Sequence, residues 1–181
     1  GKTLAEIAKI RGQDPVSACF DLIYEEGVFI YGVHHTMSEE DVKTVMRVPW
    51  VSVGSDGSAL NLQYPGKPHP RSFGTNPRVL GKYTREEKVL TLEDAVRKMT
   101  SLPAQVLGLR DRGLLREGYW ADIVVFDPDS VADTATYENP KQYPKGIDYV
   151  LVNGTVVIDG GSHSGARPGR VIYGPGKSDV A

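Results

Sequence analysis

Two charged side chains in the first half of the chain are the strongest candidates for chemistry, and the first is Asp56. It stands in Gly54-Ser55-Asp56-Gly57, directly after the short apolar run Trp50–Val53. The flanking glycines let the backbone turn sharply and leave the carboxylate exposed just past a predicted strand. In parallel α/β folds chemistry is done at this end of the strands. The alternative is an ordinary Ser-Asp-Gly turn that closes a strand.

The second candidate, Arg71, ends the segment Lys67-Pro68-His69-Pro70-Arg71. Its prolines hold the basic residues in an extended backbone of low conformational entropy. The segment lies within residues 58–81, which we predict to be a long polar loop because they contain four prolines and several glycines. Loops of this length inside a compact protein are usually functional or disordered.

Composition narrows the class of protein. The 181 residues are 40% apolar and 24% charged, with a net charge of -2, which is ordinary for a globular protein. The absence of basic runs argues against nucleic acid as a partner, and the absence of an 18-residue apolar span argues against a membrane. The single Cys19 excludes an internal disulfide and favours a cytoplasmic location. A first residue other than methionine fits a fragment or a processed chain.

The first 108 residues alternate predicted helices with two predicted strands. Capping signals and helical spacing predict helices over residues 3–12 and 14–27, and then over 38–48, 91–99 and 101–108. Apolar runs predict strands at residues 28–33 and 50–57. The order strand, helix, strand around residues 28–57 indicates a βαβ unit with parallel strands.

After about residue 109 the pattern changes to short β-rich runs. We expect strands at residues 113–115, 121–127, 149–153, 155–159 and 170–173. Asn153-Gly154 between two of them is a strong signal for a two-residue hairpin turn. The sequence therefore predicts two domains, residues 1–108 and 109–181.

These motifs together resemble the amidohydrolase superfamily, and most closely its N-acyl-D-amino-acid deacylases (D-aminoacylases). The β-rich part carries a Gly-x-Leu-x-x-Gly-x-x-Ala-Asp-Ile-Val-Val-Phe-Asp pattern, residues 113–127, that is typical of the superfamily's accessory β-domain. The finer resemblance rests on six segments in the same order along the chain: Gly54–Gly57, His69–Thr75, Pro77–Gly81, Lys98–Ala104, Tyr119–Asp122 and Gly165–Arg170.

The resemblance implies an α/β fold: the C-terminal portion of a (β/α)8 barrel, followed by part of a small β-sandwich. The implied reaction is zinc-dependent cleavage of the amide of an N-acyl-D-amino acid. Asp56 matches the family's general base, which takes a proton from zinc-bound water and passes it to the departing amine. Arg71 matches the arginine that grips the substrate's α-carboxylate, a task for which its planar fork is suited. His69 and Ser55 are the further candidates for substrate binding.

The zinc ligands that the resemblance implies are not recognisable in this chain. Such hydrolases take them from a His-x-His and from further Cys and His residues. The four histidines here, His34, His35, His69 and His163, form no metal-binding spacing. His34 and His35 end a predicted strand and could face the site or pack in a core, whereas Cys19 is interpreted as a packed thiol. A full barrel usually needs about 250 residues.

We therefore expect a C-terminal fragment whose zinc ligands lie upstream. Its partners would be the N-acyl-D-amino acid substrate, the rest of the same polypeptide and, on self-association, a second copy of the chain. Two alternatives stay open: a hydantoinase- or dihydroorotase-like amidohydrolase, and a non-catalytic structural fragment.

Overall fold

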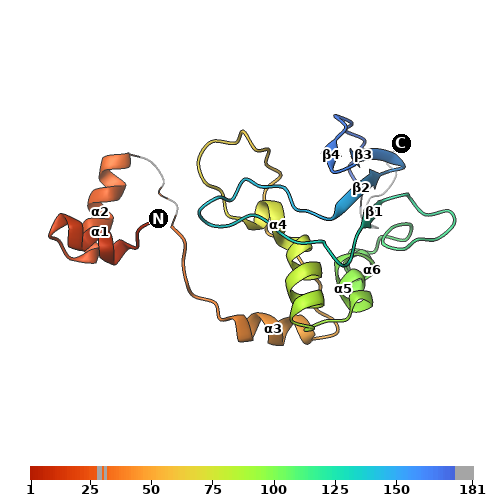
Figure 1. The fold of residues 1–181 in the computed structure, drawn as a ribbon, viewed down its shortest axis with the longest axis horizontal. Helices are drawn as coiled ribbons and strands as arrows, with labels where there is room; N and C mark the ends of the chain where they lie inside the picture. Colours follow the sequence, from red (N-terminus) through yellow and green to blue (C-terminus); the bar gives the residue numbers. More distant parts are fainter. Residues whose placement is uncertain (28–29, 31, 174–181) are drawn as a thin grey trace. The chain divides into compact units, whose positions relative to one another are not determined.

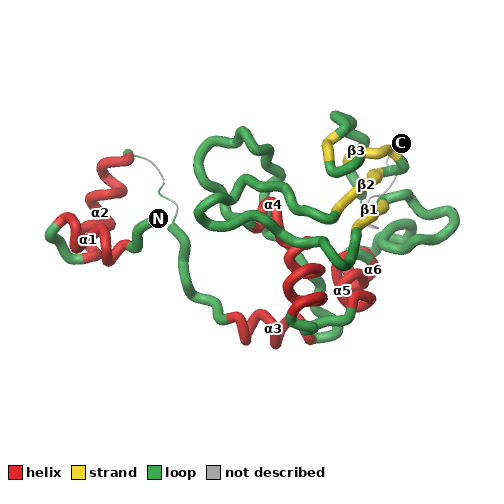
Figure 2. Tube along the Cα trace, in the orientation of Figure 1, coloured by secondary structure: helices red, strands yellow, loops and turns green. Residues whose placement is uncertain are grey.

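The computed structural model describes residues 1–27, 30 and 32–173, and divides the chain into two compact units, residues 1–38 and 39–181 (Figures 1 and 2). None of the helices in these described residues is long and apolar enough to cross a membrane. The proposed division at residue 109 stays a prediction.

The first unit is a pair of helices, α1 (Leu4–Arg11) and α2 (Pro15–Glu26). Thr3 caps α1 in a capping box, Asp14 caps α2, and each helix ends at a glycine in the left-handed region. The ion pair of Arg11 with Glu25, at 2.8 Å, joins the two helices. Both predicted helices are confirmed, and Cys19 lies half-buried on α2 as a free thiol.

The strand expected at residues 28–33 lies partly outside the described residues, because 28, 29 and 31 are not among them. Ile30 and the stretch 32–38 belong to no helix or strand. His34 and His35 lie in this stretch and are exposed.

The second unit contains the remaining helices. They are α3 (Glu39–Arg47), α4 (Arg71–Arg78), the π-helix η1 (Val79–Glu86), α5 (Leu92–Met99) and α6 (Ser101–Val106). The predictions for α3, α5 and α6 are confirmed, and Thr91 caps α5 through the N–H of Asp94.

The expectation of a loop through residues 58–81 is wrong for its second half. The chain becomes helical at Arg71 and continues through Pro77, which is buried. Proline has no N–H, so it cannot extend the α-helical hydrogen-bond ladder, and η1 begins two residues later. Pro77 is part of a helix where the sequence pattern indicated a loop.

The core of this unit lies where η1, α5 and the segment around Val131 meet. Its buried residues are Val79, Leu80, Leu90, Ala95 and Val131. The segment that contains Val131 lies very close to η1: a side chain at Gly81 would place its Cβ 2.7 Å from the Val131 carbonyl oxygen. Glycine is therefore needed at residue 81.

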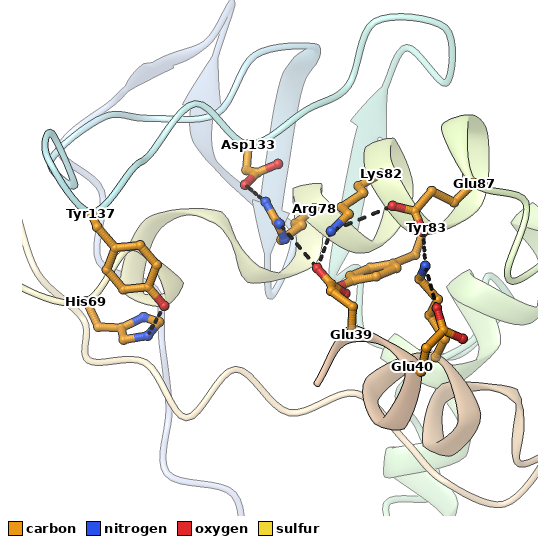
Figure 3. A network of polar contacts seen from close by, with 10 residues as sticks. Glu39, Glu40, His69, Arg78, Lys82, Tyr83, Glu87, Asp133 and Tyr137 are labelled. Carbon is orange, nitrogen blue, oxygen red and sulfur yellow. Dashed lines mark hydrogen bonds and ion pairs between the residues drawn. The ribbon is translucent and has the colours of Figure 1, made fainter. Parts of the chain in front are cut away.

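A network of charges fixes α3 against η1 (Figure 3). Glu39 accepts from the Lys82 ammonium and, at 2.9 Å, from the Tyr83 hydroxyl. Lys43 on α3 pairs with Glu87 at 3.0 Å. The hydrogen bond from Lys82 is the main reason that the pKa of Glu39 is lowered.

The strand predicted at Trp50–Gly57 is not formed. Residues 51–60 have no regular secondary structure, and Val53 donates its N–H to the Lys98 carbonyl at 3.0 Å. A strand needs a neighbouring strand to pair its N–H and C=O groups, and in the described part of the chain no strand pairs with this segment. The predicted βαβ unit is therefore absent from the residues described.

Lys98 supplies some of the hydrogen bonds that this backbone segment would otherwise receive from a neighbouring strand. Its side chain is only 1% exposed, and its ammonium donates to the Val48 and Val51 carbonyls, the latter at 3.0 Å. Neighbouring Arg97 donates to the Pro49 carbonyl at 2.6 Å. The chain leading to Asp56 is thus held by α5.

The sheet is small and antiparallel, in the order β1-β2-β3-β4. Its strands are β1 (Ile123–Phe126), β2 (Ile147–Val152), β3 (Thr155–Asp159) and β4 (Ser162–His163). The predicted hairpin is confirmed: Asn153 and Gly154 have φ of +48° and +80° and join β2 to β3. Residues 113–115 and 170–173, expected as strands, are irregular. The α/β class is as predicted, whereas the barrel and sandwich remain predictions.

Candidate active site

A turn at residues 55–58 lies directly against the start of α4. Gly57 makes this contact possible, because a Cβ there would lie 3.0 Å from the Ser72 Cα and 3.1 Å from the Arg71 carbonyl oxygen. Ser58 donates its N–H to the Ser72 hydroxyl at 3.2 Å. The turn is closed by Ser55, whose hydroxyl accepts from the Gly57 N–H at 3.2 Å.

This contact brings Asp56 and Arg71 together. The Arg71 Nη2 lies 2.9 Å from the Asp56 Oδ2. Asp56 has a φ of +46°, in the left-handed region that aspartate tolerates better than most residues. Its side chain is 84% exposed and that of Arg71 is 44% exposed. Both charged groups can therefore be reached by a solute.

His69 is held from both ring nitrogens. Its Nδ1 accepts the Arg71 backbone N–H at 3.0 Å, and its Nε2 lies 3.1 Å from the Tyr137 hydroxyl (Figure 3). An Nδ1 that accepts a hydrogen bond carries no proton, so in the neutral ring the Nε2 donates to Tyr137. Partial burial lowers the pKa of His69, the Arg71 cation lowers it further, and the Asp56 carboxylate opposes both. These contacts favour the neutral imidazole.

An open hollow of about 320 Å³ lies between the turn and α4. The turn contributes Ser55 and Gly57 to its lining, and α4 contributes Arg71 together with neighbouring residues of its first two turns. A cationic guanidinium at the wall of a hollow suits an anionic ligand.

Among the described residues, the hollow and its surroundings offer no metal site. Across residues 1–27, 30 and 32–173, no group of three or more His, Cys, Asp or Glu side chains lies close enough together to hold a metal ion. His69 is engaged by Arg71 and Tyr137 instead. These residues do not fit a zinc ion.

The family model for the amidohydrolase family matches residues 1–158. The chain belongs to the amidohydrolase family. Among relatives of known activity, the N-acyl-D-glutamate deacylase of Alcaligenes xylosoxydans xylosoxydans is 45% identical over 172 residues, which is 95% of this chain and 33% of that protein.

Solved structures of amidohydrolases show the same similarity. One is the N-acyl-D-glutamate deacylase of Bordetella bronchiseptica, in complex with zinc and a phosphonate inhibitor that mimics the tetrahedral intermediate. It is 43% identical, with a TM-score of 0.72 over 87% of this chain and 31% of its own. A D-aminoacylase structure gives 41% identity and a TM-score of 0.77, over 92% of this chain and 33% of its own. The chain thus spans about a third of the length of the relatives it matches.

The structure brings all four predicted site residues of this amidohydrolase chain into one neighbourhood. Asp56 and Arg71 form an ion pair, Ser55 shapes the turn, and His69 contacts the backbone of Arg71. Their roles in binding and catalysis remain predictions. Tyr137 was not predicted, because it lies 68 residues from His69 in a loop whose sequence carries no local signal of that contact.

Proposed function

We propose that the chain is part of an N-acyl-D-amino-acid deacylase, which hydrolyses the substrate to a carboxylate and a D-amino acid. The observation that carries the proposal is the contact between Asp56 and Arg71 beside an open hollow. The similarity to deacylases over 95% of this chain supports it further.

Asp56 is proposed as the general base. A carboxylate is ionised at neutral pH, is exposed here, and can accept a proton from an attacking water molecule. The water oxygen bonds to the acyl carbon while the carbonyl π bond opens onto its oxygen, which gives a tetrahedral intermediate. The carbonyl then reforms as the amide C–N bond breaks, and the proton held by Asp56 passes to the departing nitrogen. Asp56 gains one proton in the first step and loses it in the second, so its carboxylate is regenerated.

Arg71 is proposed to bind the α-carboxylate of the substrate. Its guanidinium can bind both carboxylate oxygens. When that end of the substrate is fixed, the configuration at Cα decides whether the acyl carbon faces Asp56. Ser55 and His69 complete this binding region, Ser55 as part of the lining and His69 through the backbone of Arg71.

The ion pair between these two residues need not hinder that role. Exposed ion pairs contribute only about 0–1 kcal/mol, because water screens them. A substrate carboxylate can therefore replace Asp56 as the partner of Arg71 at small cost. Binding would then release the Asp56 carboxylate for proton transfer.

Other parts of the whole protein complete the proposal. We place the zinc ligands, the remaining barrel strands and the rest of the sandwich in parts of the polypeptide outside these 181 residues. We place the whole protein in the cytoplasm. The two domains would be residues 1–108 and 109–181. The 181-residue chain alone is expected to bind no stoichiometric zinc and to show no deacylase activity. It should either self-associate by exchanging strands with a second copy or stay soluble only beside the missing N-terminal part.

Hydrolysis of paired enantiomers tests the function. The whole protein should release amino acid from N-acetyl-D-amino acids and leave the L-enantiomers intact. Hydrolysis of a cyclic amide in preference to both would favour a hydantoinase- or dihydroorotase-like enzyme, and no hydrolysis would favour a structural role. For the chain alone, light scattering and metal analysis are decisive: a zinc-loaded, active monomer would contradict the proposed placement of the ligands.

A further inference from the structure

The loop between β1 and β2 contacts the segment that leads into α4 at two points. The Tyr137 hydroxyl lies 3.1 Å from the Nε2 of His69. Lys141 donates from its ammonium to the Tyr64 carbonyl at 2.9 Å. The predicted domain boundary near residue 109 lies between the members of each pair, so these contacts connect the β-rich part to the segment that carries Arg71.

The loop has internal hydrogen bonds that define its shape around Tyr137. Gln142 donates from its side-chain amide to the Thr134 carbonyl at 2.6 Å and to the Asn139 carbonyl at 2.8 Å. The Asn139 N–H donates to the Thr136 hydroxyl at 3.0 Å. These hydrogen bonds therefore stabilise the turn that carries Tyr137.

The geometry of the ring pair restricts His69. The two rings are 5.1 Å apart between centroids and 79° from parallel, an edge-to-face arrangement. The hydroxyl of Tyr137 adds a hydrogen bond at one ring nitrogen of His69, while the backbone N–H of Arg71 occupies the other. With both nitrogens engaged, the ring has one preferred orientation, and it fixes the backbone at the first residue of α4.

We propose that Tyr137 is a positioning residue for Arg71: its hydroxyl orients His69, and His69 holds the backbone of Arg71 in place. The inference rests on the proposed function for the identity of the ligand that Arg71 binds. Tyr137 itself touches neither Arg71 nor Asp56 in any contact of the described structure, and acts through His69.

This arrangement predicts an effect on substrate affinity. Tyr137→Phe keeps the ring and its edge-to-face contact and removes one hydrogen bond between neutral groups. Such a bond is worth about 0.5–1.5 kcal/mol, so KM for an N-acetyl-D-amino acid should rise about two- to tenfold. The kcat should stay within about twofold, because Asp56 is unchanged.

The experiment compares Tyr137→Phe with Tyr149→Phe in the whole protein. Tyr149 lies on β2, is 43% exposed, and makes no contact with the site among the described residues, so it controls for the loss of a hydroxyl. Each variant is assayed on the N-acetyl-D-amino acid and on its α-carboxamide. Only Tyr137→Phe should raise KM, and only for the substrate that carries the carboxylate.

Combination with Arg71→Ala, which removes the carboxylate-binding side chain altogether, separates positioning from a general packing effect. If Tyr137 acts through Arg71, its substitution should cost little more once the guanidinium is gone. Additive losses in the double variant, or an equal loss on the carboxamide, would overturn the inference. A KM for Tyr137→Phe no different from that of Tyr149→Phe would do the same.

An amide resonance gives a readout that does not depend on activity. In ¹⁵N-labelled protein, Tyr137→Phe should shift the backbone amide signal of Arg71, whereas Tyr149→Phe should not. An unmoved signal refutes the contact through His69. A wild-type protein without deacylase activity refutes the proposed function and with it the carboxylate ligand, and the amide signal still decides whether Tyr137 holds Arg71.

Discussion

Replacing Arg71 with lysine keeps the positive charge and removes the fork that can bind two carboxylate oxygens. Lysine offers a single ammonium, so at least one charge-assisted hydrogen bond to the substrate is lost. Bonds of this kind contribute about 1.5–3 kcal/mol, which corresponds to about a 10- to 150-fold fall in kcat/KM.

The structure places the expected value at the lower end of that range. The Arg71 side chain is 44% exposed, and water weakens hydrogen bonds and ion pairs at such a position. We therefore expect a fall of about 10- to 30-fold for an N-acetyl-D-amino acid. Folding should hardly change, because the exposed ion pair with Asp56 adds little stability.

The assay is initial-rate hydrolysis by the whole protein of an N-acetyl-D-amino acid and of its α-carboxamide. The fall should be confined to the substrate with the carboxylate. Arg110→Lys is a matched control, since Arg110 is exposed, follows α6 in the chain and is not among the residues that line the hollow. If the carboxamide loses as much as the acid, Arg71 serves the structure and does not bind the carboxylate.

Three further predictions concern the unit of residues 39–181. Gly81→Ala should lower the free energy of unfolding in urea by about 1–3 kcal/mol, because its Cβ would lie 2.7 Å from the Val131 oxygen. Lys98→Met should lower it by about 2–4 kcal/mol, because it leaves two part-buried carbonyls, of Val48 and Val51, without their donor. The lowered pKa of Glu39, caused mainly by Lys82, stabilises the fold above the ordinary pKa of about 4.3. That contribution should disappear as the pH falls through the lowered, folded-state pKa.

Each of these has its own control. Gly169→Ala introduces the same methyl group where nothing lies within 4 Å, so a loss as large as that at Gly81 would refute the packing argument. Lys98→Arg keeps the charge and should retain more stability than Lys98→Met. For Glu39, the stability difference between wild type and Glu39→Gln should shrink between pH 6 and pH 3, and a constant difference would contradict the linkage.

Local signals in the sequence were sufficient for part of the fold. Thr3, Asp14 and Thr91 cap helices through their own side chains within three residues, so their patterns carry the information. The turn at Asn153-Gly154 is local in the same way, because both residues adopt positive φ at small cost.

The wrong predictions concern features that depend on distant residues. Trp50–Gly57 has the composition of a strand. A strand forms only when a second strand supplies hydrogen-bond partners for its backbone, and the sequence of the segment itself cannot show whether such a strand is present. Pro77 was interpreted as a loop residue, yet it lies inside α4. The helical segment around it packs closely against residues 131–133, which are distant in the sequence. The candidate roles of Asp56 and Arg71 followed from the resemblance to deacylases, whereas their ion pair and the contact between His69 and Tyr137 became visible only in the structure.

The turnover of Asp56→Asn in the whole protein tests the central claim most directly. Asparagine has nearly the same shape but cannot accept the proton, so kcat for an N-acetyl-D-amino acid should fall by about two to four orders of magnitude. Zinc content and the urea unfolding midpoint should stay at the wild-type values, because Asp56 is 84% exposed and is proposed to act on water. A variant that keeps most of its turnover would contradict the assignment of Asp56 as the general base.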